Sequence, residues 1–284
     1  MNPSRLHAVY GPRALVLGAS AGIGLAFAEE LAAAGFDLVL AARRIEPLRR
    51  AAAGLSGRFG VDVRTLVLDL SRPDPWPLLA EALEGEDWGL VVYNAAASPI
   101  GHFLDLDLTA ARRTVAVNVA APLDVVHAGG NALRTRHQTT GRRGGIILLS
   151  SLSGFRGTPH ISAYAASKAW NIVLAEGVGA ECRREGVDLM ACVAGATDTP
   201  GYRDSVVSSG PGAPIQPPAA VARAALKKLG RTTVMVPGFA NRLVVALVYR
   251  ALPRRWSIAL MGRATASLRH RDDAAPAEFS SPED

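Results

Sequence analysis

A hydroxyl, a phenol and an amine stand at spacings that allow one strand and one helix to bring them together. Ser151 follows the apolar run 145–149, whose short, β-branched and aliphatic composition predicts a strand buried on both faces. Tyr164 and Lys168 lie four residues apart in an Ala-rich segment that predicts a helix, so their side chains share one face. We therefore expect all three groups to meet at the end of this strand.

These groups could carry out acid–base chemistry on an oxygen atom. A free tyrosine has a pKa of ~10, and a fixed cation nearby favours the phenolate. We predict that Lys168 lowers the pKa of Tyr164, which then acts as general acid or base, while Ser151 hydrogen-bonds the oxygen whose charge changes. The competing interpretation is a tyrosine on a helix surface beside a solvated lysine.

The spacing of this segment resembles the active-site segment of the short-chain dehydrogenase/reductase family. Tyr164 lies thirteen positions after Ser151, Lys168 lies four positions further on, and Pro159 lies eight positions after the serine. The resemblance implies a proton donor at Tyr164, an oxygen-binding hydroxyl at Ser151, and a lysine that also binds the nicotinamide ribose.

A glycine-rich turn follows the predicted strand 13–17 and opens a predicted helix over 22–34. Glycines at such a turn let the backbone approach a pyrophosphate, which rests against the amides of the helix N-terminus. The uncharged run 14–28 superficially resembles a secretory signal, but its three glycines argue against an apolar helical core. Gly-x-x-x-Gly-Ile-Gly resembles the family's own fingerprint, although Leu17 replaces its usual threonine. The implied contacts are Gly18, Ser20, Ala21, Gly22, Ile23 and Gly24.

The second predicted strand, residues 36–42, bears on cofactor choice. An acidic residue at its end would bind the ribose hydroxyls of NAD, but this sequence has Ala42 followed by Arg43 and Arg44. Arginine can hold a phosphate through its planar fork, so we predict NADPH rather than NADH. Two solvated arginines at a helix start are the alternative.

Three later segments resemble further family sites. The resemblance implies an adenine contact at Asp69, although a helix cap is the alternative there. It implies that Asn118 supports a proton relay and a local helix distortion. The alternative is a buried asparagine whose amide simply forms its hydrogen bonds within the core. Tyr93, Ala96 and Ala194 depart from the family pattern. The implied cofactor contacts in these segments are Asp69, Leu70, Asn94, Ala95, Ala96, Gly195, Thr197 and Thr199, together with Tyr164 and Lys168.

Composition argues against a nucleic-acid-binding surface, a metal site and a disulfide framework. The chain has 284 residues and a net charge of +6, and its basic excess is almost entirely arginine without the interleaved aromatics of a nucleic-acid platform. Cys182 and Cys192 form no paired motif, so we expect a reducing, cytoplasmic setting, no metal site and no disulfide framework.

The remaining segments complete an alternation of strands and helices. We predict a long helix over 109–133, a surface loop over 135–144, a mobile lid over 201–218, a helix over 218–229 and a last strand over 232–236. Beyond Pro237, two apolar segments rich in arginine suit a helix on an anionic membrane, a cover over the substrate mouth, or a subunit contact. We expect a Rossmann-fold domain over 1–237, this helical extension over 238–270, and a disordered tail over 271–284.

The whole pattern predicts a single α/β domain with a doubly wound parallel sheet. The resemblance implies an NADPH-dependent oxidoreductase that interconverts a carbonyl compound and its alcohol, and homodimers or homotetramers. The apolar character of residues 97–103, Phe155, residues 158–161 and the lid favours a hydrophobic substrate. The alternatives are a protein of the same fold that senses NADPH without chemistry and a protein that acts at the membrane surface. A dehydratase or epimerase of the extended family fits less well, because the glycine spacing differs.

Overall fold

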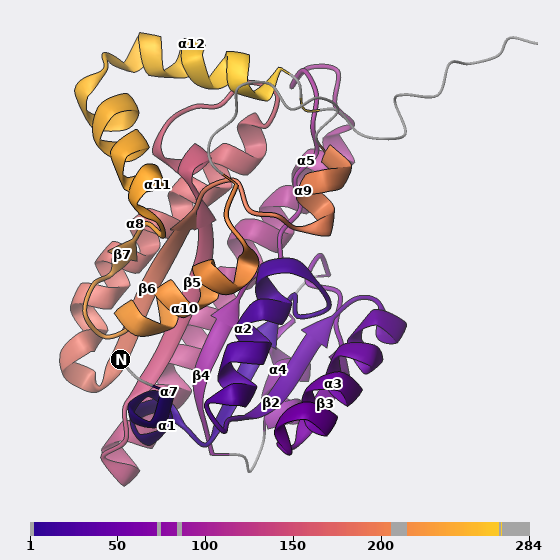
Figure 1. The fold of residues 1–284 in the computed structure, drawn as a ribbon, viewed down its shortest axis with the longest axis vertical. Coiled ribbons are helices and arrows are strands. Elements are labelled where there is room, and N and C mark those ends of the chain that lie inside the picture. The colour runs from indigo at the N-terminus through magenta and orange to yellow at the C-terminus, as the bar shows by residue number, and fades with distance from the viewer. Residues whose placement is uncertain (1–2, 73–74, 84–86, 206–214, 267, 269–284) are drawn as a thin grey trace, which may run out of the picture.

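A seven-stranded parallel sheet forms the centre of the molecule (Figure 1). The structure is a computed structural model, and it describes residues 3–72, 75–83, 87–205, 215–266 and 268. The strand order is β3-β2-β1-β4-β5-β6-β7. The strands are β1 (Arg13–Leu17), β2 (Asp37–Ala42), β3 (Val63–Val67), β4 (Trp88–Tyr93), β5 (Gly144–Ser151), β6 (Val187–Ala194) and β7 (Val234–Met235).

Burial explains where these strands lie in the sheet. All residues of β1, β4 and β6 are buried, as is β5 up to Ser150, which agrees with their largely apolar sequences. β3 is largely exposed, and its polar residues suit the edge of the sheet. The predicted doubly wound fold is confirmed.

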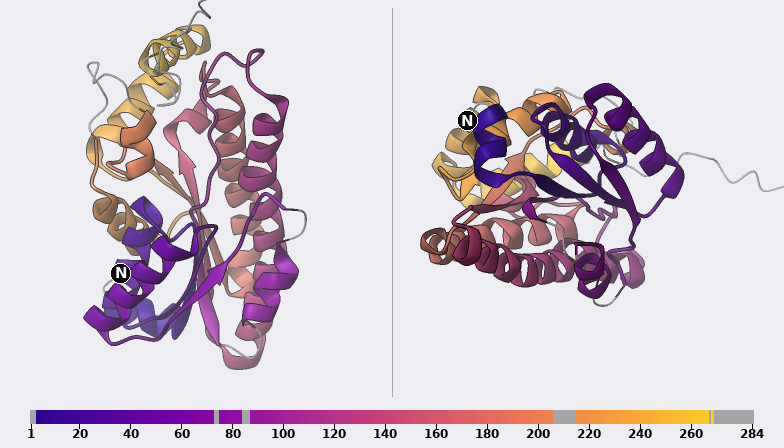
Figure 2. Two further views of the ribbon diagram at one scale, coloured as in Figure 1. Left: turned by 90° about the vertical axis from the view of Figure 1, so that its right-hand side faces the viewer. Right: turned by 90° about the horizontal axis from the view of Figure 1, so that it is seen from below.

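Helices cover both faces of the sheet (Figure 2). One face packs against α2 (Gly22–Ala33), α3 (Ile45–Phe59) and α10 (Pro218–Lys228). The opposite face packs against α4 (Trp76–Leu83), the long run from α5 to α7, and α8 (Ser162–Cys182). That run comprises α5 (Leu108–Val115), a π-helical turn (Ala116–Ala120), α6 (Ala121–Asp124), a second π-helical turn (Val125–Gly129) and α7 (Gly130–Thr140).

The strand order changes direction between β1 and β4, and this determines where a ligand can bind. In open parallel sheets, ligands lie beyond the carboxyl ends of the strands at such a switch point. Gly18 follows β1 and Asn94 follows β4, and the Asn94 side-chain amide donates to the Gly18 carbonyl at 2.9 Å. The predicted glycine-rich turn and the predicted asparagine therefore meet at this point.

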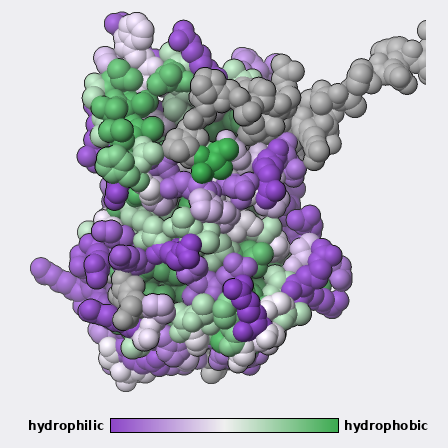
Figure 3. Space-filling model, viewed as in Figure 1, coloured by the Kyte–Doolittle hydropathy of each residue, from purple (hydrophilic) through white to green (hydrophobic). Residues whose placement is uncertain are grey.

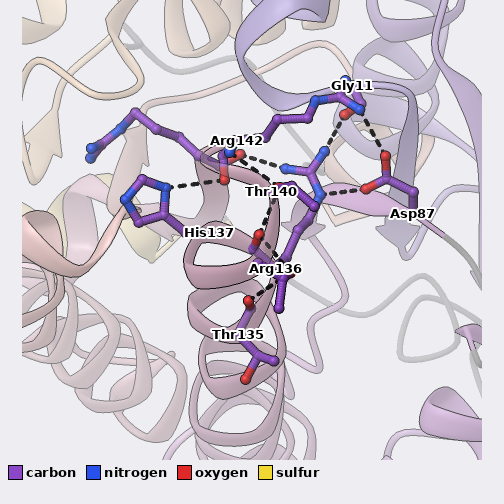
Figure 4. Close-up of polar contacts among 9 residues, drawn as sticks. Gly11, Asp87, Thr135, Arg136, His137, Thr140 and Arg142 are labelled. Carbon is purple, nitrogen blue, oxygen red and sulfur yellow. Dashed lines mark hydrogen bonds and ion pairs between the residues drawn. The ribbon is translucent and has the colours of Figure 1, made fainter.

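The predicted loop over 135–144 was wrong, because α7 continues to Thr140 and ends at Gly141 in the left-handed conformation. Arg136 binds the Asp87 carboxylate and the Gly11 carbonyl, and Arg142 Nη1 lies 2.7 Å from Asp87 Oδ2 (Figure 4). These tertiary contacts hold a helix end whose threonine- and arginine-rich sequence shows little apolar periodicity.

The start of the chain differs from the sequence-based expectation. A helix, α1 (Pro3–Tyr10), precedes β1 and was not predicted. The predicted lid begins with α9 (Pro200–Ser205), while residues 206–214 lie outside the described residues, as does the predicted tail over 271–284. The C-terminal extension forms α11 (Phe239–Val244), a π-helical segment (Val245–Ala251) and α12 (Arg254–Thr265).

Candidate active site

Ser151 and Tyr164 meet at the carboxyl end of β5. β5 ends at Ser151, a 3₁₀ turn follows over Leu152–Phe155, and α8 then begins at Ser162, which places Tyr164 in its first turn. The Ser151 hydroxyl lies close enough to the Tyr164 phenol to lower the pKa of that phenol. It also accepts hydrogen bonds from the hydroxyl of Ser153 at 3.0 Å and from the Ser153 amide at 3.3 Å. Ser153 was not identified from the sequence, although its hydroxyl helps to orient Ser151.

Lys168 is buried one turn further along α8. Its ammonium donates to the Leu149 carbonyl at 2.7 Å and lies 5.4 Å from the centroid of the Tyr164 ring. Burial lowers the pKa of Lys168 to about 8. The amine therefore lies beside the phenol, as predicted, and its hydrogen bond anchors it to β5.

The predicted effect of Lys168 on Tyr164 differs from what the structure shows. Burial raises the pKa of the Tyr164 phenol above its ordinary value, and the Ser151 hydroxyl opposes that rise. The amine lies over the ring and donates to Leu149, and desolvation of the buried phenol is the largest influence on its pKa. Spacing alone could not reveal this, because it shows which groups meet but not how dry their surroundings are.

Asn118 bonds to α8 next to Lys168, at Ser167. It is fully buried in the π-helical turn Ala116–Ala120, which agrees with the predicted helix distortion. Its side-chain oxygen accepts from the Ala97 amide at 2.8 Å, and its amide donates to the Ala97 carbonyl at 2.8 Å and to the Ser167 hydroxyl at 3.0 Å. Asn118 therefore ties the segment after β4 to α8. We refer to Ser151, Tyr164, Lys168 and Asn118 as the polar cluster.

Two departures from the family pattern have a structural explanation. The Tyr93 hydroxyl donates to the Val117 carbonyl at 2.6 Å, so this buried tyrosine fixes the backbone beside Asn118. Ala96 is exposed, so its methyl group occupies surface and does not displace a packed neighbour. This contact of Tyr93 could not be predicted from local patterns, because its partner lies 24 residues away.

The glycine-rich turn fits a dinucleotide. A side chain at Gly18 would lie 2.7 Å from the Ala95 amide nitrogen, and one at Gly24 would lie 2.2 Å from the Gly18 carbonyl oxygen. Ala21, which precedes α2, makes no side-chain cap, and the first turn of α2 carries no acidic residue. The amides at this helix start can therefore bind phosphate oxygens. Ser20 and Ile23 lie in the same turn and are partly exposed.

The turn after β6 faces the glycine-rich turn. A side chain at Gly22 would lie 3.0 Å from the Thr199 methyl group, so Thr199 stands beside the start of α2. Thr197 is buried, and its hydroxyl donates to the Gly195 carbonyl at 3.0 Å. Ala194, where the family has proline, continues the pairing of β6 with β5 opposite Ser151.

The end of β2 presents two exposed arginines. Arg43 and Arg44 follow Ala42, and Arg44 precedes the first turn of α3. Asp69, at the end of the neighbouring chain segment, accepts from the amide and the hydroxyl of Ser71, and these bonds lower its pKa, with smaller contributions from Arg113 and Arg43. Asp69 forms this turn rather than capping a helix, since α4 begins only at Trp76, and Leu70 beside it is buried. We refer to Arg43 and Arg44 as the arginine pair.

Comparison with known proteins places this site in a family. The short chain dehydrogenase family model matches residues 12–207. The chain is 36% identical over 191 residues to a 7β-hydroxysteroid dehydrogenase of Clostridium sardiniense, covering 67% of this chain and 71% of the relative. It is 30% identical over 241 residues to the enzyme of that name from Collinsella aerofaciens, covering 82% and 88% of the two chains.

Solved structures agree with the sequence relatives. A structure of a 7β-hydroxysteroid dehydrogenase, studied for its stereoselectivity, superimposes with a TM-score of 0.83 at 28% identity, over 90% of this chain and 98% of that chain. A short-chain dehydrogenase from Sphingobium yanoikuyae in complex with NADPH gives a TM-score of 0.70 at 30% identity, over 80% and 87%. The matched residues contain the glycine-rich turn and the whole polar cluster, and this chain belongs to the short-chain dehydrogenase family of oxidoreductases.

Proposed function

We propose that the protein is an NADPH-dependent reductase of a hydrophobic ketone. The observation that carries this proposal is the meeting of Ser151, Tyr164 and Lys168 at the carboxyl end of β5, next to the switch point of the sheet. A hydroxyl and a phenol at one point can hold and protonate a carbonyl oxygen. The sequence relatives support a carbonyl or alcohol substrate, because they are named as hydroxysteroid dehydrogenases.

The bound nicotinamide would supply the hydride to the carbonyl carbon, and the chain's own residues would handle the oxygen. Ser151 donates a hydrogen bond to that oxygen, and Tyr164 gives it a proton. Tyr164 is the proton donor in the reductive direction, and its burial favours the protonated form of the phenol. Lys168 binds the nicotinamide ribose, and Asn118 fixes the helix distortion that supports the proton relay.

The preference for NADPH rests on the arginine pair. Both residues are exposed at the end of β2, where an acidic residue would repel a 2′-phosphate, and neither forms an ion pair within the described part of the chain. Asp69 lies near Arg43 and attracts it electrostatically. The Sphingobium relative, whose structure contains NADPH, supports the same preference.

A hydrophobic substrate, such as a steroid, fits the side chains around the site. Phe155 ends the 3₁₀ turn after Ser151, and its ring lies 5.6 Å from that of Tyr249. The Tyr249 hydroxyl contacts the Met261 sulfur at 3.0 Å, so aromatic and thioether groups gather next to the segment that leads to Tyr164. The hydroxysteroid substrates named for several relatives are apolar ring systems of this kind.

We further propose a homodimer through α5, α6 and α8. Val115, Leu123 and Val173 are exposed on these neighbouring helices, and a shared interface would bury them.

The decisive experiment is NADPH oxidation, followed at 340 nm, over a panel of cyclic ketones, steroid ketones and short polar ketones. We expect turnover with the apolar ketones and much slower turnover with NADH. NADPH binding without oxidation of any ketone would instead indicate the sensing protein considered from the sequence. Turnover confined to short polar ketones would contradict the hydrophobic substrate class.

A further inference from the structure

The C-terminal extension has an apolar surface that the reaction does not require. Six of the fifteen large apolar side chains that are exposed in the described part of the chain fall between residues 239 and 260. Space-filling atoms coloured as hydrophobic gather over α11 and the π-helical segment (Figure 3). The six side chains are Phe239, Leu243, Leu247, Leu252, Trp256 and Leu260.

These side chains form two stripes at helical spacing. Phe239, Leu243 and Leu247 lie four residues apart along α11 and the π-helical segment, while Asn241, Val245 and Tyr249 are buried on the inner side. Leu252, in the bend before α12, and Trp256 and Leu260 on α12 repeat the spacing, while Ser257 and Thr265 of this helix are buried. Each helix is therefore fixed to the protein by one face and presents the other face outward.

The charged side chains of this segment are all positive. No aspartate or glutamate occurs between residues 239 and 268, whereas five arginines do, namely Arg242, Arg250, Arg254, Arg255 and Arg263. All five are exposed, and the Arg255 guanidinium lies 5.8 Å from the centroid of the Trp256 ring. An exposed tryptophan, leucines and arginines on one amphipathic helix pair match the boundary between acyl chains and anionic headgroups.

We propose that this surface, defined by the six apolar residues and five arginines above, binds an anionic lipid bilayer. The helices would lie on the membrane, because no helix in the described ranges is long and apolar enough to cross one. The apolar stripes enter the headgroup region, and the arginines bind lipid phosphates.

The same helices form hydrogen bonds with the segment that leads to Tyr164. The Thr265 hydroxyl donates to the Pro159 carbonyl at 2.9 Å, and Arg156 donates to the Tyr249 carbonyl. Pro159 lies five residues before Tyr164. The lipid-binding surface therefore lies on the outer side of helices whose inner side packs against the segment leading to Tyr164, so an apolar substrate dissolved in the membrane would be released close to the site.

The test is sedimentation of the full chain with extruded vesicles of phosphatidylcholine alone or with 30 mol% phosphatidylglycerol. It requires neither NADPH nor a ketone, so its result does not depend on the proposed reaction. We expect binding to the anionic vesicles at low salt, a loss of binding at high salt, and a blue shift of tryptophan fluorescence that is absent in Trp256→Ser.

Two pairs of variants separate the apolar and the charged contributions. Leu243→Ser with Leu247→Ser should lower the partition coefficient about tenfold or more, and Arg250→Gln with Arg255→Gln about tenfold at low salt. The matched controls, Val67→Ser with Leu104→Ser and Arg50→Gln with Arg184→Gln, change exposed residues elsewhere and should leave binding within about twofold.

Three results would overturn the proposal. The wild-type chain could remain in the supernatant with both kinds of vesicle. The control pairs could lose binding as much as the surface pairs. Alternatively, size-exclusion chromatography could show that Leu243→Ser with Leu247→Ser dissociates an oligomer, which would assign the surface to a second copy of the chain.

Discussion

The polar cluster and the arginine pair both lie near the carboxyl ends of the strands, but they differ in how deeply their side chains are buried. Lys168 and Asn118 are buried, and their polar atoms bind other parts of the fold, such as the Leu149 and Ala97 backbones. Arg43 and Arg44 are exposed on the surface. A buried side chain serves stability and chemistry together, whereas an exposed one can change ligand preference without disturbing the fold. Substitutions in the two regions should therefore have different signatures.

Tyr164→Phe should have the largest effect. The variant keeps the ring and its packing but removes the proton donor, so we expect turnover to fall on the order of 10³-fold. NADPH affinity should stay within a few-fold, since the hydroxyl is one of many contacts. Steady-state kinetics and a fluorescence titration with NADPH measure the two quantities. Loss of NADPH binding in parallel with activity would mean that Tyr164 has a structural role.

Lys168→Met tests how strongly the cluster is desolvated. The folded-state pKa of Lys168 is about 8, below its ordinary value of 10.5, so between these pH values the unfolded state binds more protons. Lys168 therefore makes the protein more stable as the pH rises from 8 to 10.5. We expect this gain in the free energy of unfolding to disappear in Lys168→Met, as measured by urea denaturation at each pH.

The exposed Lys228→Met is the control for this series, and it should keep the wild-type pH dependence. An unchanged pH dependence in Lys168→Met would show that the amine is hydrated in solution.

Arg43→Ala should alter selectivity alone. Removal of one charged hydrogen-bonding group should weaken NADPH binding about tenfold, while NADH binding changes by less than about twofold. Because the residue is exposed, the melting temperature should hardly move. Calorimetric titration with both cofactors measures the difference, and Arg50→Ala on α3 provides a control. An equal loss for both cofactors would contradict the proposed phosphate contact.

Tyr93→Phe should have the smallest effect, and it tests a buried residue next to the polar cluster. It leaves the Val117 carbonyl without its 2.6 Å partner, which should cost about 1–2 kcal/mol of stability. Urea unfolding measures this change. Tyr202→Phe, which removes a hydroxyl for which the described residues show no hydrogen bond, should be neutral. Equal stability of the two variants would mean that water replaces the lost bond.

Much of this organisation could be predicted from sequence because it depends on local patterns. The strand 13–17 and the start of the helix at Gly22 were predicted to the residue, since an apolar run and a glycine-rich turn mark them directly. The long helix was predicted only to Leu133, because Arg136 and Arg142 hold its end through Asp87, a contact between distant segments. Periodicity cannot reveal such a contact.

The features of the site also divide into those that local spacing predicted and those that depend on distant contacts. The spacing of Ser151, Tyr164 and Lys168 identified the residues that meet, because one strand and one helix fix it. Ser167 and Tyr93 were missed, since each acts on the π-helical turn through a partner far away in the chain. The direction of the Tyr164 pKa shift was also missed, because it depends on burial by the whole fold.

The amide of Asn118 has a consequence for how this protein could be re-engineered. Its oxygen accepts from the Ala97 amide, and its nitrogen donates to the Ala97 carbonyl and the Ser167 hydroxyl. These hydrogen bonds clamp the backbone just before the segment 98–107 begins. Insertions or exchanges beyond that clamp would reshape the neighbourhood of the substrate while the proton-handling groups keep their positions. Directed evolution toward bulkier ketones should therefore begin immediately after Ala97 and leave the clamp intact.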